Sequence, residues 1–343
     1  MNLPQVYMSR PATVVPQTAV DNEEVLSRVR ESFRGTARDW DPLEQTIRYV
    51  FDRCNSNMRY IVDDTELPPG EFAAQAARDC LALNGVAASD VDLLVYGGVA
   101  RDVFEPAMAV EVAARIGAKE LHAMDVTCAC AGLIEALHTV TGYFALHDEF
   151  QTALVCAGEV CRVHDRINYG LQSPEDVVTG VAGLTMGNAA AAFLVTRDPL
   201  PGGGARLEGL LHKTLSEHYD LCRAPVDGYF TSRSKELFAL SVHVEPEVSK
   251  LLAQVGWCPA DVDHYAFHQP SDAVLQRVFS DLGAKPQACI YTHAMYGNTA
   301  STAWVLALDH RLKNGGIAAG DKIVVGSAAA GFTIVAAAAV WEC

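Results

Sequence analysis

Cys130 lies between an apolar, strand-like stretch and a helical stretch, and a cysteine side chain can act as a nucleophile. Cys130 follows a run of apolar residues and precedes a segment whose leucines, isoleucine and valine recur at three- and four-residue spacing. Near the first turn of a helix, unpaired N–H groups and the helix dipole favour the thiolate, which is the reactive form. The simpler alternative is a small core residue, because most buried cysteines only fill space.

A histidine and an asparagine occupy comparable places. His268 closes a buried apolar run, and Pro270 prevents regular continuation of that strand. Asn298 follows a glycine turn and precedes a helical stretch. Taken singly, His268 is interpreted as a hydrogen-bonded histidine at a strand end and Asn298 as a helix N-cap. Together with Cys130, at turns that converge in an α/β fold, they predict one functional site.

The elements that must position these residues alternate between strands and helices, which predicts an α/β fold with buried sheets. The apolar runs predict strands at 6–15, 91–98, 153–158, 189–195, 207–212 and 264–268, and two more within 323–341. Residues 60–62 are predicted to form a short strand or a turn. Helical spacing predicts helices at 22–33, 43–54, 72–83, 107–116, 235–255, 273–282 and 298–312. Prolines and glycines at 199–204 divide the chain into halves 1–200 and 205–343. Both halves show the same alternation, which indicates a duplicated domain.

Composition limits the classes of partner. The 343 residues are 50% hydrophobic and carry a formal charge of −16, typical of a globular enzyme and unfavourable for nucleic acid or an anionic membrane. Ten cysteines without paired C-x-x-C knuckles predict free thiols in a reducing cytoplasm, not a zinc site or a disulfide scaffold. The uncharged run 323–341 has the length of a membrane span, but its internal glycines favour two buried strands. The amino terminus predicts no signal peptide.

Three motifs in fixed order resemble the thiolase-superfamily condensing enzymes, most closely β-ketoacyl-acyl-carrier-protein synthase III. They are Asp-Val-Thr-Cys-Ala-Cys-Ala-Gly at 125–132, His-Gln-Pro at 268–270 and Tyr-Gly-Asn-Thr-Ala-Ser at 296–301. The resemblance runs from about residue 72 to the end of the chain. It implies a thiolase-like duplicated fold, with five αβαβα layers and two mixed sheets. It also implies a homodimer without a cofactor, whose substrates are thioesters of acyl carrier protein or coenzyme A.

The resemblance also implies roles for individual residues. Cys130, not Cys128, accepts the acyl group as a thioester, because Ala-Gly must follow the nucleophile. His268 and Asn298 hydrogen-bond the carbonyl of the second thioester and stabilise its enolate. The closing turn contributes oxyanion and substrate contacts, and it carries fewer glycines than is usual in the family, which leaves less room beside its N–H groups. Its residues are Ala330, Gly331 and Phe332.

Glu105 departs from the pattern of family members that decarboxylate malonyl groups, which tend to have an apolar residue before the proline. The segment 101–107 looks more like the branch that joins two acyl chains head to head, including olefin-pathway thiolases and stand-alone ketosynthases of resorcinol and pyrone pathways. In that branch the glutamate enters the partner subunit's site and removes a proton from the α-carbon, as a buried carboxylate with a raised pKa can do. The alternative is a helix N-terminal residue favoured by the dipole.

These observations predict a ketosynthase that forms a carbon–carbon bond by Claisen condensation, in polyketide or fatty-acid-derived secondary metabolism. The segment 52–60 resembles type III polyketide synthases, which share the Cys-His-Asn trio, so it leaves the substrate open. One alternative is a decarboxylating synthase III that uses a malonyl thioester. Another is an acyltransferase on the same fold, which the retained Asn298 argues against. A non-catalytic partner subunit should have lost one residue of the trio.

Overall fold

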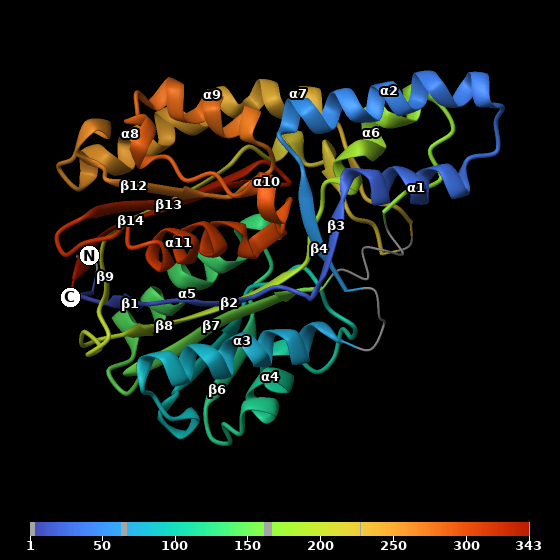
Figure 1. The fold of residues 1–343 in the computed structure, drawn as a ribbon. Coiled ribbons are helices and arrows are strands. Elements are labelled where there is room, and N and C mark those ends of the chain that lie inside the picture. Colours follow the sequence, from blue (N-terminus) through green and yellow to red (C-terminus); the bar gives the residue numbers. More distant parts are fainter. Residues whose placement is uncertain (1–3, 63–66, 161–166, 227, 343) are drawn as a thin grey trace.

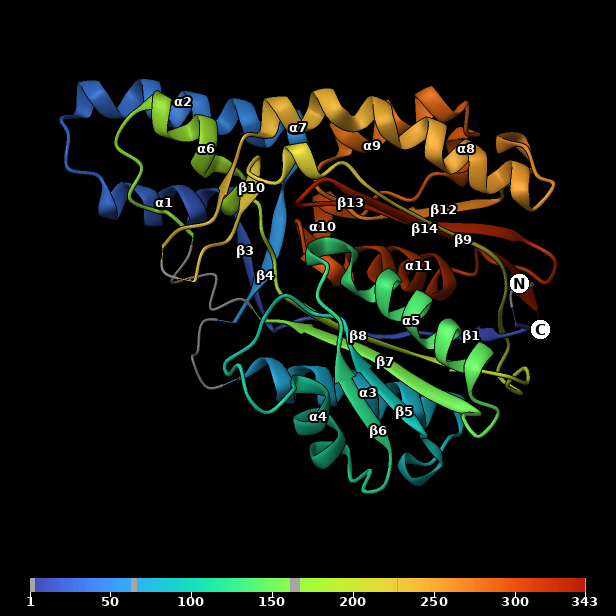
Figure 2. The same ribbon diagram turned by 180° about the vertical axis from the view of Figure 1, so that it is seen from behind.

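Two helices lie at the centre of the molecule, between two layers of strands (Figures 1 and 2). The structure is a computed structural model that describes residues 4–62, 67–160, 167–226 and 228–342. The central helices, α5 (Gly132–Leu146) and α11 (Ala303–Lys313), contact strands of both layers. Helices α8 (Val244–Gln254) and α9 (Asp272–Leu282) cover the upper layer, and α3 (Pro69–Asn84) and α4 (Met108–Ile116) cover the lower one. The five predicted layers are therefore present.

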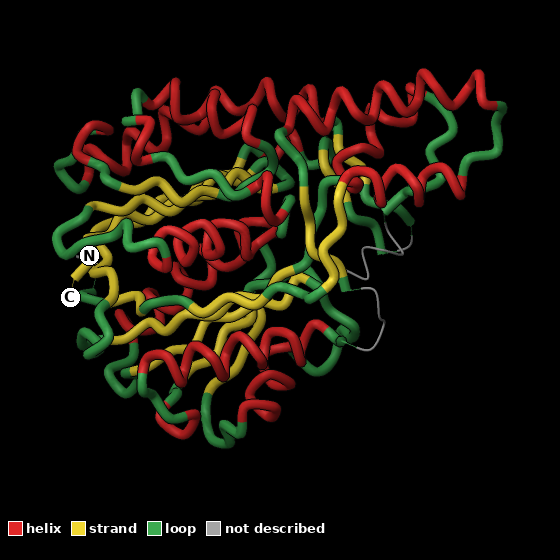
Figure 3. Tube along the Cα trace, in the orientation of Figure 1, coloured by secondary structure: helices red, strands yellow, loops and turns green. Residues whose placement is uncertain are grey.

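The strands of both layers belong to one hydrogen-bonded sheet, which Figure 3 shows in yellow. Its order is β12-β13-β14-β9-β1-β8-β7-β5-β6, with β2 paired to β8. The upper strands are β9 (Gly204–Thr214), β12 (His264–Phe267), β13 (Lys322–Ala329) and β14 (Thr333–Glu342). The lower strands are β1 (Tyr7–Ser9), β2 (Ala12–Val14), β5 (Leu93–Tyr96), β6 (His122–Asp125), β7 (Thr152–Glu159) and β8 (Ala189–Thr196). The two predicted sheets are continuous because β1 pairs with both β8 and β9.

The two halves of the chain repeat one order of strand pairing. In the lower layer β5 is parallel to β7, β7 antiparallel to β8, and β8 antiparallel to β1. In the upper layer β12 is parallel to β13, β13 antiparallel to β14, and β14 antiparallel to β9. The division of the chain into 1–200 and 205–343 stays a prediction. Strand β6 lies at the end of the order, beside β5.

The burial of the strands follows from their sequences. Every residue of β8 is buried, as its uninterrupted alanine, phenylalanine, leucine and valine run predicts. The uncharged run near the carboxyl end forms the hairpin of β13 and β14, so the prediction of two strands there is confirmed. Within the described ranges, Ala129–Leu146 is long and apolar enough by composition to cross a membrane. Half of that stretch is buried inside the molecule, between the two layers, as expected of a core helix.

Several helices differ from the prediction. The expected helix 235–255 is two helices, α7 (Ser234–Leu240) and α8, separated by a 3₁₀ turn. The expected helix 298–312 starts only with α11, because a 3₁₀ turn precedes it. Helix α6 (Pro174–Leu184) and the short α10 (His293–Tyr296) were not predicted. Helix α10 has only four residues, too few to show a helical period. In α6 the spacing of Val177, Val181 and Leu184 is a helical signal that the sequence prediction missed.

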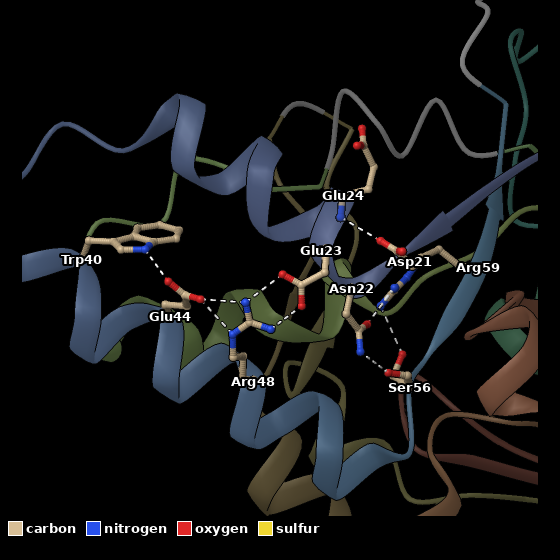
Figure 4. Close-up of polar contacts among 9 residues, drawn as sticks. All are labelled: Asp21, Asn22, Glu23, Glu24, Trp40, Glu44, Arg48, Ser56 and Arg59. Atoms are coloured by element: carbon tan, nitrogen blue, oxygen red, sulfur yellow. Dashed lines mark hydrogen bonds and ion pairs between the residues drawn. The ribbon is translucent and has the colours of Figure 1, made fainter. Parts of the chain in front are cut away.

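The amino-terminal helices α1 (Asn22–Ser32) and α2 (Ala37–Cys54) extend beyond the sheet together with α6 (Figure 1). Figure 4 shows how polar contacts fix their base, with the Arg48 guanidinium held between the carboxylates of Glu23 and Glu44. Beside it, β4 (Met58–Ile61) pairs with β3 (Thr18–Asp21). The buried guanidinium of Arg59 donates to Asn22 Oδ1 and to Ser56 Oγ. These contacts fix β4 beside the turn that follows α10.

Candidate active site

Cys130 lies in a 3₁₀ turn, η2 (Ala129–Ala131), directly before α5. It is half-buried, and Ala129 before it has a left-handed backbone with φ of 45°. Non-glycine residues in this region are uncommon and concentrate at functional sites. Gly132 follows, and a Cβ there would lie 1.9 Å from the carbonyl oxygen of Gly97. This contact explains why glycine must stand two residues after Cys130. Cys130 therefore lies near the first turn of a helix, as expected, in the 3₁₀ turn that leads into α5.

His268 extends the line of β12, where its backbone N–H donates to the carbonyl of Gly326 in β13 at 2.8 Å. The next residue holds this strand end in place, because Gln269 Nε2 donates to the carbonyls of Phe267 and Ile290. Gln269 Oε1 in turn accepts the N–H of Thr292. The ring of His268 is buried. Its position is therefore set by a rigid strand end.

Asn298 lies in the turn after α10, where Gly297 has a φ of 66°. Two backbone hydrogen bonds hold the turn against the end of α6: Asn298 N–H donates to the carbonyl of Thr185 at 2.9 Å, and Gly187 N–H donates to the carbonyl of Asn298 at 3.0 Å. The side-chain Oδ1 accepts the N–H of Ala300 at 3.0 Å. Because Oδ1 is used locally, the Nδ2 group is the one able to donate to a ligand. The interpretation of Asn298 as a helix N-cap is wrong, since Thr299 precedes η8 and Thr302 precedes α11.

Contacts with one segment of β13 bring Cys130 and His268 together. Ser327 Oγ donates to the carbonyl of Cys130 at 3.2 Å, and the preceding residue, Gly326, accepts from His268. The turn η8 (Ala300–Thr302), which follows Asn298, packs against η2, and the Ala300 backbone lies beside the His268 ring. The structure therefore brings together, between the two sheet layers, the segments that carry all three predicted residues.

The thiol of Cys130 is not acidic in the single chain. Burial raises its pKa well above the ordinary value, and the nearby Cys222 and Glu159 raise it further. The expectation that the helix start would lower this pKa is wrong, because the loss of solvation outweighs the dipole. Formation of the thiolate therefore requires a base or a bound substrate.

His268 is neutral at physiological pH. Its pKa is lowered to about 4, mainly by burial and also by the neighbouring His293, while a hydrogen bond with the Ala300 backbone partly opposes the shift. Nδ1 is buried without a hydrogen-bond partner in the described part of the chain. A neutral imidazole has one N–H donor and one free acceptor. The ring is thus able either to donate to an oxyanion or to take a proton.

These buried histidines predict that the protein loses stability in mild acid. Burial also lowers the pKa of His293 to about 4, from an ordinary value near 6.5. Between these two values the unfolded chain binds more protons than the folded one, so the free energy of unfolding falls as the pH falls through 6.5 toward 4. Each such histidine contributes a loss of about 2 kcal/mol between pH 7 and pH 5.

Urea unfolding at the two pH values measures this effect. The loss for the wild type should exceed that for His293→Asn by about 2 kcal/mol. Asparagine is the suitable replacement because its amide nitrogen takes the position of the ring Nδ1 and can keep the 2.9 Å contact with the Gln269 carbonyl. Equal losses for the two proteins would contradict the assignment of a neutral, buried His293.

Cys128 and the closing turn border η2 on another side. Burial raises the pKa of the Cys128 thiol to about 11, Glu135 adds to this, and a hydrogen bond with Thr333 opposes it. The turn of Ala330, Gly331 and Phe332 joins β13 to β14, and both strands contact η2. Its location fits the predicted oxyanion and substrate contacts, which stay a prediction.

Glu105 is exposed in the single chain, in the loop between β5 and α4. Asp125 fixes the end of this loop, since its carboxylate accepts the N–H groups of Met108 and Ala109 at 3.0 and 2.9 Å. Arg101 lies 3.6 Å from the same carboxylate and also donates to Thr127 at 3.1 Å. The expected burial of Glu105 lies in the site of a partner subunit, so it stays a prediction. Burial there requires a second subunit.

Three further polar residues of the site were not predicted: Glu159, Ser301 and Ser327. Glu159 is fully buried, and its charge raises the pKa of the Cys130 thiol. It ends the buried strand β7 as His268 follows β12, so a search for polar residues at strand ends would have found it. Ser301 bonds to Glu159, and Ser327 bonds to the Cys130 carbonyl. Ser301 ends the motif at 296–301, whereas the sequence around Ser327 gives no comparable signal.

Comparisons with known proteins agree with this geometry. Residues 252–341 match the family described as 3-oxoacyl-[acyl-carrier-protein] synthase III, C terminal. The β-ketoacyl-[acyl-carrier-protein] synthase III 3 of Streptomyces coelicolor is 28% identical over 319 residues, 87% of this chain and 91% of that protein. The acyl-CoA:acyl-CoA alkyltransferase of Xanthomonas campestris is 26% identical over 286 residues, 81% of this chain and 84% of that protein.

Solved structures show the same fold. A crystal structure of Xanthomonas campestris OleA with bound lauric acid and lauroyl-CoA has a TM-score of 0.90 at 21% identity and covers 99% of this chain and 100% of that chain. FabH from Pseudomonas aeruginosa, a 3-oxoacyl-(acyl carrier protein) synthase III, has a TM-score of 0.83 at 22% identity and covers 99% of both chains. The predicted resemblance and the thiolase-like fold are confirmed.

Proposed function

We propose that this synthase III-like condensing enzyme joins two acyl thioesters head to head, without loss of carbon dioxide. The observation that carries the proposal is the meeting of the segments of Cys130, His268 and Asn298 between the two sheet layers. A glutamate, Glu105, lies in the loop before α4, whose end Asp125 fixes. A nucleophile, two donors and a base are the groups that such a condensation needs. A relative, the Xanthomonas alkyltransferase, is named for acyl-CoA substrates on both sides, which supports the same reaction here.

The proposed reaction has two half-reactions. In the first, the Cys130 sulfur forms a bond to the carbonyl carbon of one acyl thioester and the carrier thiol leaves, taking up a proton. The neutral ring of His268 accepts the proton of the Cys130 thiol, whose pKa is raised by burial. The acyl group is then held as a thioester on η2. No cofactor takes part, because the carrier thioester already activates the carbonyl.

In the second half-reaction a carbon–carbon bond forms. The carbonyl oxygen of the second thioester accepts hydrogen bonds from His268 and from Asn298 Nδ2, and Glu105 of the partner subunit removes the α-proton. The resulting carbanion attacks the acyl carbon on Cys130, and the Cys130 thiolate leaves. The product is a β-keto thioester that contains both chains. A preorganised pair of donors stabilises the enolate more than the ground-state carbonyl, which is the source of the rate gain.

The role of Glu105 requires a homodimer, which the position of β6 supports. This strand ends the sheet order and leads directly to η2, so pairing of two copies along it would place the 101–107 loops near the partner's Cys130. The loop also exposes Phe104, whose surface is 79% accessible, beside Glu105. An exposed phenylalanine there fits burial by a second copy. Sedimentation should show a dimer at micromolar concentration, and a monomer would remove this role from Glu105.

The second candidate is decarboxylating condensation with a malonyl thioester. The name β-ketoacyl-[acyl-carrier-protein] synthase III of several relatives favours it. Under that reaction the loss of carbon dioxide generates the carbanion, and His268 and Asn298 suffice.

A comparison of second substrates tests the proposal. The purified protein is supplied with one fatty acyl-CoA alone, or with the same acyl-CoA plus malonyl-CoA or malonyl-acyl-carrier protein. We expect a β-keto product that contains two fatty acyl chains in the first reaction, with no release of carbon dioxide. Product formation only when a malonyl thioester is present would contradict head-to-head condensation and establish the second candidate.

A further inference from the structure

A buried carboxylate that the proposed reaction does not use lies beside the site. Glu159 is fully buried at the end of β7. One of its oxygens, Oε1, accepts the N–H of Val99 at 3.0 Å, and the other, Oε2, accepts the N–H of Ala100 at 3.2 Å. Oε1 also accepts the hydroxyl of Ser301 and, at 3.4 Å, its N–H. Four donors from two distant segments therefore meet on one carboxylate.

The first two donors belong to the start of the loop that carries Glu105. Residues 97–100 leave the end of β5, and the loop then runs past Glu105 to the start of α4. The hydroxyl of Tyr96 donates to the carbonyl of Ala100 at 2.6 Å, which adds a second contact at the same place. At its far end the loop is held by Asp125, as described above. Glu159 and Asp125 thus fix the two ends of the loop, and Glu105 lies between them.

The other two donors belong to the turn that carries Asn298. Ser301 is fully buried in η8, the turn that packs against Cys130's own turn. Ala300, between Asn298 and Ser301, has a left-handed backbone with φ of 50° and donates its N–H to Asn298 Oδ1. A non-glycine residue keeps this conformation only when its surroundings impose it. The bonds from Ser301 to Glu159 supply such a constraint.

The carboxylate is stable in the core only because these donors surround it. Burial raises the pKa of Glu159, and the hydrogen bonds from Ser301, Val99 and Ala100 oppose that shift. A buried carboxylate without donors would be costly, and buried N–H groups without an acceptor would be costly too. The charge and the two segments therefore stabilise one another.

We propose that Glu159 is a positioning residue that fixes the Glu105 loop and the Asn298 turn relative to each other around Cys130. The proposal rests on the proposed function, because its consequence is confined to the half-reaction in which Asn298 and Glu105 act. The Cys130 turn has its own supports, the Ser327 hydroxyl and the contact between Gly97 and Gly132. Acyl loading therefore depends little on Glu159, whereas condensation depends on it strongly.

Glu159→Gln tests this positioning role, because it replaces one carboxylate oxygen by an NH₂ group and keeps the size of the side chain. An amide has one acceptor oxygen, so its NH₂ group faces one of the N–H donors of Val99 and Ala100, which is left unpaired. We expect acyl loading of Cys130 to stay within a few-fold of wild type and the condensation rate to fall roughly tenfold or more. Glu135→Gln is the matched control. The pKa of Glu135, like that of Glu159, is raised by burial, but Glu135 lies on α5, outside both segments. It should leave both rates unchanged.

Amide hydrogen exchange gives a second readout that needs no turnover. In Glu159→Gln the amides of 97–107 and 298–303 should exchange faster, while those of β12 and β13 keep their protection. Ser301→Ala removes one donor and no charge, and it should likewise make the amides of 298–303 exchange faster. This variant keeps the test valid if Glu159→Gln does not fold. Unchanged exchange in both segments, or equal losses of loading and condensation, would overturn the proposal. If the wild-type protein forms no carbon–carbon bond, the proposed function is contradicted. The hydrogen-exchange measurement then decides by itself whether Glu159 positions the two segments.

Discussion

Replacement of Cys130 by alanine is expected to abolish acylation of the protein. Alanine fits the half-buried position in η2 without a clash, so the fold should be kept while the nucleophile is lost. Loss of a covalent nucleophile lowers turnover by roughly 10⁶-fold in well-studied enzymes. Mass spectrometry of the intact protein after incubation with an acyl-CoA measures the effect: the wild type should gain one acyl group and Cys130→Ala none.

Cys128 provides the matched control for this experiment. It lies two residues earlier, is half-buried like Cys130, and its thiol is hydrogen-bonded to Thr333. Cys128→Ala should therefore keep most of the loading. If an acyl group appears on Cys128 in the Cys130→Ala protein, or if loading is lost only in Cys128→Ala, the assignment of the nucleophile is wrong.

Replacement of Glu105 by glutamine should separate the two half-reactions. Glutamine keeps the size of the side chain and removes the base, so condensation should fall by roughly 10²–10⁴-fold, the range typical of general bases. Acyl loading should persist, because that step uses the Cys130 thiol and not a remote carboxylate. Loading is followed by intact mass and condensation by the two-chain product. Condensation at close to the wild-type rate would make Glu105 a structural residue of the loop.

Mixed dimers show whether Glu105 acts across the subunit boundary. A heterodimer of one Cys130→Ala subunit and one Glu105→Gln subunit contains one site with both Cys130 and the partner's Glu105, if the loop crosses over. We expect this heterodimer to recover about half of the wild-type condensation rate, while each mutant homodimer stays inactive. An inactive heterodimer would place the glutamate in its own subunit's site.

The residues of the Cys-His-Asn set could be predicted because each follows a buried strand or a glycine turn, and such places are visible in a sequence as changes of polarity and period. The closing strands were predicted for a similar reason, since glycines interrupt an otherwise uncharged run. The helix expected at 298–312 starts late because a 3₁₀ turn precedes it. Local periodicity cannot distinguish such a turn from the first turn of an α-helix.

Features that depend on distant contacts were not predictable. The left-handed backbones of Ala129 and Ala300 are imposed by two turns packing against each other, and alanine gives no local signal for them. The pKa of Cys130 was expected to be low from its place near a helix start, but the surrounding core raises it. The exposure of Glu105 likewise depends on where the loop lies relative to the sheet. Each of these properties arises from segments far apart in the sequence.

The central claim is that this protein joins two acyl chains by a carbon–carbon bond. A condensation experiment with mixed isotope labels tests this claim most directly. The wild-type protein is incubated with an equal mixture of unlabelled and uniformly ¹³C-labelled acyl-CoA, and the products are analysed by mass spectrometry. The account predicts a β-keto product in which one labelled and one unlabelled chain are joined, absent with Cys130→Ala. Products that contain a single acyl chain, as a free acid, ester or amide, would contradict it.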